Sequence, residues 1–131
     1  MQLARSAFPV LAWGFLGLLA IQVFLAGVGL FGAGTIAGHR DFGYLLSLLP
    51  VILLVTAAIA RAGRLVWVTG ALLVLSFVQT LLPLLKADLP YVAALHPVNA
   101  LVLAALTVTI ALRATELARA PRAEPETASA R

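Results

Sequence analysis

Four long apolar stretches constrain the fold of this chain more than any other feature. They cover about residues 8–31, 42–60, 65–85 and 91–112, and each is near the ~20 residues that a helix needs to cross a bilayer. Overall, 63% of the residues are hydrophobic and only 11% are charged. Water-soluble domains of this size do not have such a composition. We therefore expect an all-α integral membrane protein, a four-helix bundle of transmembrane helices.

The basic residues predict how the chain crosses the membrane. Arginines gather in the N-terminal segment, the second loop and the C-terminal tail, whereas the first and third loops carry only Arg40 and Lys86. Because cytoplasmic loops retain the positive charge, both termini should be cytoplasmic in a multi-pass protein of the bacterial inner membrane. The net charge is +4, and the basic residues lie in the loops and termini, where they orient the chain in the membrane. The expected partner is therefore the lipid bilayer and not nucleic acid.

Residues 1–113 are expected to form the transmembrane domain, and residues 114–131 a cytoplasmic tail. The tail is rich in Ala, Arg, Glu and Pro and should be mostly disordered, above all from Pro121 onward. Within the second and third spans, Pro50 and Pro83 predict kinks, since each removes one helical hydrogen bond. The bond lost at Pro83 is the one to the carbonyl of Gln79, four residues earlier, and in lipid that carbonyl needs a partner inside the protein.

A pair of polar residues occurs twice within these apolar stretches. Gln22 precedes His39 by the same interval that separates Gln79 from His96, and the two pairs are offset by 57 residues. His39 and His96 are the only two histidines in the chain. The repeat predicts two tandem helical hairpins, related by a pseudo-twofold axis along the membrane normal, with both copies of each polar residue at similar depth.

Facing histidines from the two hairpins would form a binding site for a metal or a haem. The chain has no cysteine, so His39 and His96 are the candidate metal ligands, and axial ligation of haem b requires their ring nitrogens to be about 4 Å apart. Gln22 and Gln79 are candidate members of the same cofactor site, and Arg40 is a candidate partner of a haem propionate. The alternatives are interfacial histidines, glutamines that bridge helices, and an Arg40 paired with Asp41 or with headgroup phosphate.

Short motifs around these residues add two resemblances. The segment His39-Arg40-Asp41-Phe42-Gly43 resembles the His-Arg-x-x-Gly signature that opens a helix in haem A synthase, whose two halves are each four-helix haem-binding bundles. That family has a glutamate three residues before the histidine, where this chain has Ile36. The resemblance therefore implies ligation by His39 and His96, but not oxidation of a haem substituent.

The second resemblance covers roughly residues 8–113. With Gln22, His39, Gln79 and His96-Pro97, this region resembles a family of small uncharacterised bacterial four-helix membrane proteins. That family carries no assigned function.

Three functions remain after the sequence is considered. The leading hypothesis is a small membrane haem-b binding protein for electron transfer or haem handling. The second is a non-catalytic scaffold or assembly subunit without a cofactor, with a membrane protein partner or as a homo-oligomer, because many glycines permit close helix contact. Transport is disfavoured because the apolar stretches contain no Asp or Glu, and no soluble-enzyme motif is present, so no enzymatic activity is predicted.

Overall fold

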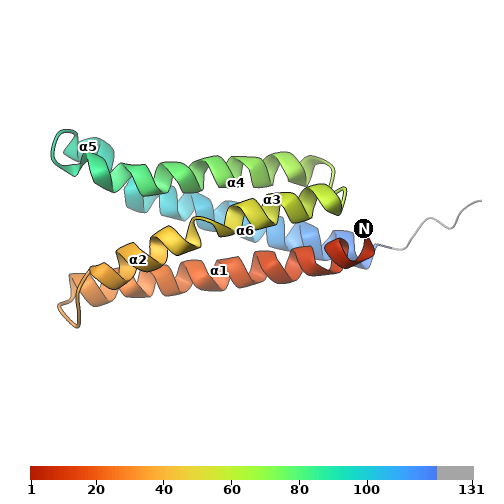
Figure 1. Ribbon diagram of the computed structural model, residues 1–131, viewed down its shortest axis with the longest axis horizontal. Coiled ribbons are helices and arrows are strands. Elements are labelled where there is room, and N and C mark those ends of the chain that lie inside the picture. The colour runs from red at the N-terminus through yellow and green to blue at the C-terminus, as the bar shows by residue number, and fades with distance from the viewer. Residues whose placement is uncertain (121–131) are drawn as a thin grey trace, which may run out of the picture.

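The computed structural model describes residues 1–120, and within them the chain is helical with short connections (Figure 1). The elements are α1 (Gln2–Leu30), α2 (Ala37–Leu46), α3 (Leu49–Ile59), α4 (Arg64–Leu81), the 3₁₀ helix η1 (Leu82–Lys86), α5 (Pro90–Ala93) and α6 (Leu95–Arg119).

These elements make four helical segments that are long and apolar enough to cross a membrane: Gln2–Leu30, Ala37–Ile59, Arg64–Lys86 and Pro90–Arg119. The prediction of an all-α, four-helix membrane bundle is confirmed. The last segment extends into the predicted tail as far as Arg119, while the disorder expected from Pro121 onward lies outside the described residues.

The two prolines expected to kink the second and third spans, Pro50 and Pro83, each stand where an α-helix is interrupted. Pro50 stands in the first turn of α3, after α2 has ended at Leu46, and Figure 1 shows the break between the two helices. Pro83 stands in the first turn of η1, where α4 tightens into a 3₁₀ helix. Each proline lacks the N–H that would continue the α-helix, so the chain restarts with the proline at a position that needs no donor.

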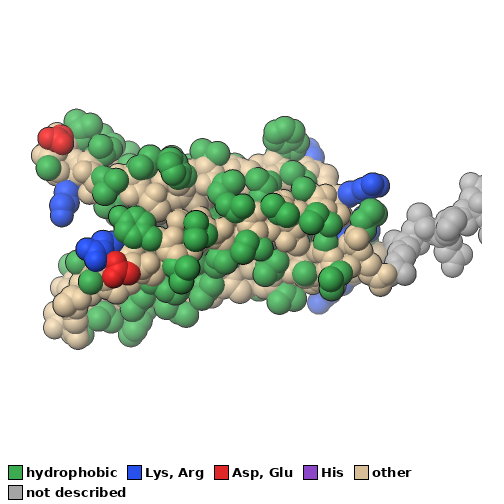
Figure 2. Space-filling model, viewed as in Figure 1, with side chains coloured by type: hydrophobic (Ala, Val, Ile, Leu, Met, Phe, Trp, Pro, Cys, Tyr) green, Lys and Arg blue, Asp and Glu red, His purple; other side chains and the backbone are tan. Residues whose placement is uncertain are grey.

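The helices pack in a ring around a narrow core. Helix α1 packs against α3 and α6, and α4 packs against the same two helices from the opposite side. The N-terminus lies at one end of the bundle (right in Figure 1), and α5 lies at the other, which we call the α5 end. Large apolar side chains cover the outside of the bundle, whereas charged side chains gather toward its ends (Figure 2). That distribution suits a surface that faces lipid along its length.

Burial follows the 57-residue repeat of the sequence. When the chain is shifted by that interval, buried residues of the first hairpin fall on buried residues of the second. The pairs are Ala12 with Thr69, Phe15 with Leu72, Leu46 with Leu103, Pro50 with Thr107, Leu53 with Ile110, and Ala57 with Ala114. The two hairpins therefore present equivalent faces to the shared core, as the two-hairpin prediction requires.

Candidate functional site

Each of the two histidine rings is hydrogen bonded in the same way to the backbone of the glutamine in its own hairpin. In each hairpin, Nδ1 of the histidine lies 3.0 Å from the backbone carbonyl oxygen of its glutamine, for His39 with Gln22 and for His96 with Gln79. A carbonyl oxygen only accepts, so each Nδ1 carries the proton and donates it. In the neutral ring, the lone pair is then on Nε2, which is the nitrogen of this tautomer that can act as a metal ligand.

Local backbone structure brings each histidine to its glutamine. In the first hairpin, the loop of residues 31–36 turns the chain back, with Gly32 at φ +73°, so that His39 in the first turn of α2 lies beside Gln22 of α1. In the second, Pro83 frees the carbonyl of Gln79 from its helical bond, and His96 donates to that same oxygen. The polar group released by the proline thus has its partner inside the bundle.

The two hairpins bring these half-buried rings together. The ring centres of His39 and His96 are 6.1 Å apart, and the ring planes meet at 79°.

A count of residues along the helices gives a different expectation. Counting from Arg61 to His39 and from Arg113 to His96 at ~1.5 Å per residue would place the two histidines about 7 Å apart along the membrane normal. That count is misleading because Arg113 lies inside α6, which continues to Arg119, and because Ser47 and Leu48 interrupt the α2–α3 span.

The glutamine side chains differ between the hairpins. The Gln22 amide Nε2 donates to the backbone oxygen of His39 at 2.8 Å, while its Oε1 is buried with no hydrogen-bond partner among residues 1–120. The Gln79 amide Nε2 lies 3.3 Å from Nε2 of His96, and its Oε1 accepts from Asn99 Nδ2 at 2.7 Å. The sequence prediction missed Asn99, although its position three residues after His96 on a helix was a usable signal.

Gly43 permits the close approach of α2 to α1. A Cβ atom on Gly43 would lie 2.6 Å from Gln22 Nε2, which is too close for two non-bonded heavy atoms. The glycine of the His-Arg-x-x-Gly segment therefore makes room for the glutamine amide. Its equivalent in the second hairpin is Ala100.

Among residues 1–120, the side chain of Arg40 is hydrogen bonded to Asp41 and to neither histidine ring. Its Nε donates to Asp41 at 2.8 Å, and both side chains are 63% exposed. This is the pairing that the sequence offered as an alternative to propionate binding. Figure 2 shows that the α5 end of the visible face is hollowed between two lobes, each with a Lys or Arg side chain.

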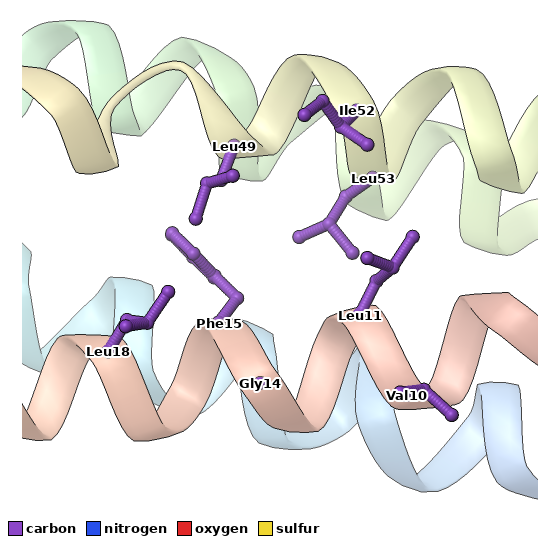
Figure 3. Close-up of a pocket in the computed structure, with 8 residues that line it drawn as sticks. All are labelled: Val10, Leu11, Gly14, Phe15, Leu18, Leu49, Ile52 and Leu53. Atoms are coloured by element: carbon purple, nitrogen blue, oxygen red, sulfur yellow. The ribbon is translucent and has the colours of Figure 1, made fainter.

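A separate apolar pocket lies between α1 and α3. Its volume is about 200 Å³, and Figure 3 shows its lining from the two helices: Val10, Leu11, Gly14, Phe15, Leu18, Leu49, Ile52 and Leu53. None of these side chains carries a hydrogen-bonding or metal-ligating atom. The pocket therefore offers no ligands to a metal, and the histidine pair is the candidate site. Within the described residues no cluster of three or more His, Cys, Asp or Glu forms a metal site.

Part of the chain matches a known protein family. Residues 22–86 match DUF6220, a family of unknown function. The match confirms the resemblance to an uncharacterised family, and its range contains Gln22, His39 and Gln79 but ends before His96. No curated protein and no solved structure matches the chain, so the comparisons lend no support to the resemblance to haem A synthase.

Proposed function

We propose that this protein is a small membrane haem-b binding protein with His39 and His96 as axial ligands. One observation carries the proposal, the 6.1 Å separation of the two ring centres. Two imidazoles on one iron need about 2 Å from metal to nitrogen and about 1 Å from nitrogen to ring centre on each side, or about 6 Å in all. The separation of the rings agrees with that requirement.

The hydrogen bonds of the two rings also support it. Haem iron binds a neutral imidazole nitrogen, and the ring is usually oriented by a bond from its other N–H to a carbonyl or carboxylate. Here the carbonyls of Gln22 and Gln79 hold the Nδ1 protons at 3.0 Å. These bonds favour the tautomer whose lone pair is on Nε2 in both rings, the nitrogen that would ligate the iron.

Bound haem b would supply a one-electron Fe(III)/Fe(II) couple for electron transfer, or would itself be the cargo in haem handling. The chain's own contribution is to hold the two rings, to exclude water with an apolar bundle and to bind the haem carboxylates. Arg40 is the proposed propionate partner, since a guanidinium binds a carboxylate in bidentate fashion. For that role it would leave Asp41, which is inexpensive because the pair is exposed.

The proposal places the site near the outer face of the membrane. Positive charge in the N-terminal segment and in the α3–α4 turn supports an inner-membrane protein with both termini in the cytoplasm. The α5 end would then be the outer end. The expected partners are the bilayer and a redox protein or haem acceptor on that side.

The direct test is haem binding by protein purified in detergent. We expect the wild type, expressed with ample haem, to show a six-coordinate low-spin absorption spectrum that sharpens on reduction with dithionite. His39→Ala and His96→Ala should each lose the six-coordinate spectrum. Thr109→Ala, an exposed residue of α6 whose hydroxyl bonds its own helix, is the control and should keep it. Wild-type protein without haem, or six-coordinate single variants, would reject the proposal.

A scaffold without cofactor is the second candidate. Gly14 and Gly17 of α1 have no heavy atom within 4 Å of the place a Cβ would occupy. Another transmembrane helix, from a partner protein or a second copy, can therefore approach the backbone there. A stable complex that is weakened by Gly14→Leu but indifferent to loss of both histidines would favour this function over haem binding.

A further inference from the structure

The two imidazoles are equivalent in the sequence repeat but differ at Nε2. Nε2 of His39 has no hydrogen-bond partner among residues 1–120, and it is not among the side-chain polar atoms that are buried without one. Within residues 1–120 it is therefore unpaired, and it is not fully buried. Nε2 of His96, in contrast, has the Gln79 amide 3.3 Å away.

The backbone carbonyl of Leu75 determines the orientation of two side-chain amides in the second hairpin, first that of Asn99 and through it that of Gln79. Asn99 Nδ2 lies 3.0 Å from the backbone oxygen of Leu75, which only accepts, so this atom is the amide nitrogen. The same nitrogen donates to Gln79 at 2.7 Å, so the facing Gln79 atom is Oε1. The other end of the Gln79 amide is then the N–H group, and it donates to the lone pair of His96 Nε2.

The first hairpin lacks this arrangement because of one residue. The position equivalent to Asn99 is occupied by Phe42, which has no polar atom. The Gln22 amide N–H donates instead to the backbone of His39, and its Oε1 is buried without a partner in the described part of the chain. Asn99 is thus the residue that turns the second glutamine toward its histidine.

We propose that Asn99, acting through Gln79, caps the metal-binding nitrogen of His96, so that His39 is the first ligand and His96 the second. This inference rests on the proposed function, since it assigns an order to the same two ligands. Haem or a metal ion meets a free lone pair at His39. At His96, the hydrogen bond from Gln79 has to open first. Asn99 is a positioning residue and does not touch the ligand itself.

The cap is testable without any cofactor. In metal-free protein labelled with ¹⁵N-histidine, an Nε2 lone pair that accepts a hydrogen bond resonates at lower ¹⁵N shift than a free one. We expect two distinct Nε2 signals, with that of His96 at lower shift. Asn99→Leu, which keeps the side-chain shape and removes both hydrogen bonds, should move the His96 signal toward that of His39. Phe42→Leu, at the equivalent position of the first hairpin, is the matched control and should move neither.

Gln79→Met removes the capping amide directly and protects the test against a poorly folded Asn99 variant. It should shift the His96 signal in the same direction. Equal Nε2 shifts for the two histidines in the wild type would overturn the inference, as would a His96 signal that stays in place in both Asn99→Leu and Gln79→Met.

Haem binding followed in time gives a second measurement. Wild-type protein should pass from a five-coordinate to a six-coordinate spectrum in a resolved second step, and Asn99→Leu should speed that step about fivefold, the factor that one net hydrogen bond represents. An unchanged second step would contradict the inference. Protein that binds no haem in any variant would reject the proposed function, while the nuclear magnetic resonance experiment would still decide on the cap.

Discussion

His39 and His96 are 57 positions apart in the chain, yet their ring centres are 6.1 Å apart and their ring planes meet at 79°. Each ring is held by the glutamine of its own hairpin, through a 3.0 Å hydrogen bond to a backbone carbonyl. The convergence therefore results from two similar local structures and from the packing of the hairpins. It requires no direct bond between the two histidines.

The juxtaposition of the rings can be measured without a cofactor. Because these are the only histidines, selective histidine labelling gives two ring systems that single His→Ala variants assign. With ring centres at 6.1 Å, ring protons of the two residues should give nuclear Overhauser effects to one another in detergent micelles. Effects from each ring to detergent protons but none between the rings would contradict the structure.

Gly43→Ala should loosen the packing of α2 on α1. The added Cβ would lie 2.6 Å from Gln22 Nε2, so the amide must move and release its bond to the backbone of His39. We expect the free energy of unfolding in micelles to fall by about 1–3 kcal/mol. Gly38→Ala is the control on the same helix, with no atom within 4 Å, and should cost nothing. Equal effects of the two variants would argue against the tight contact.

Ser76→Ala should stabilise the bundle. The Ser76 hydroxyl is buried and has no partner among the described residues, and an unpaired buried hydroxyl in an apolar core is unfavourable. Its removal should raise the free energy of unfolding by about 1 kcal/mol. A comparable loss of stability would instead show that the hydroxyl is satisfied by a bound water.

Gly63→Ala should destabilise the turn between α3 and α4 through backbone strain alone. Gly63 has φ 57° and ψ −125°, a region that residues with a Cβ rarely occupy, and no atom lies within 4 Å of the added methyl group. We expect a cost of about 1–3 kcal/mol in unfolding experiments. Gly70→Ala has equally open space but lies inside α4, so it should be neutral or stabilising. A neutral Gly63→Ala would contradict the assigned turn conformation.

Much of the fold could be predicted from the sequence because hydropathy dictates it. Apolar stretches that are long enough to cross a bilayer can hardly form anything except transmembrane helices. The end of the first helix near Gly32 and the turn at Gly63 follow from the backbone conformations that glycine permits. The repeat predicted that His39 and His96 would face one another, but it did not predict that each ring would bond the backbone of its own glutamine. The position of Pro83 also predicted that the carbonyl of Gln79 would need a partner.

The asymmetry of the site could not be predicted in this way. The repeat compares the two hairpins position by position, and it treats Gln22 and Gln79 as the same residue. Their amides face different atoms because Asn99 stands where the first hairpin has Phe42. Such a difference depends on the direction of single hydrogen bonds, which spacing does not encode. The exposed ion pair of Arg40 with Asp41 is likewise one of three arrangements that the sequence left open.

The most direct test of the proposal that His39 and His96 both ligate haem is the electron paramagnetic resonance spectrum of the oxidised, haem-loaded protein. Ring planes at 79° to one another predict the strongly anisotropic low-spin signal of nearly perpendicular axial imidazoles, and its loss in both His39→Ala and His96→Ala. A rhombic low-spin signal of parallel rings, a high-spin signal of a single ligand, or no haem signal at all would contradict the account.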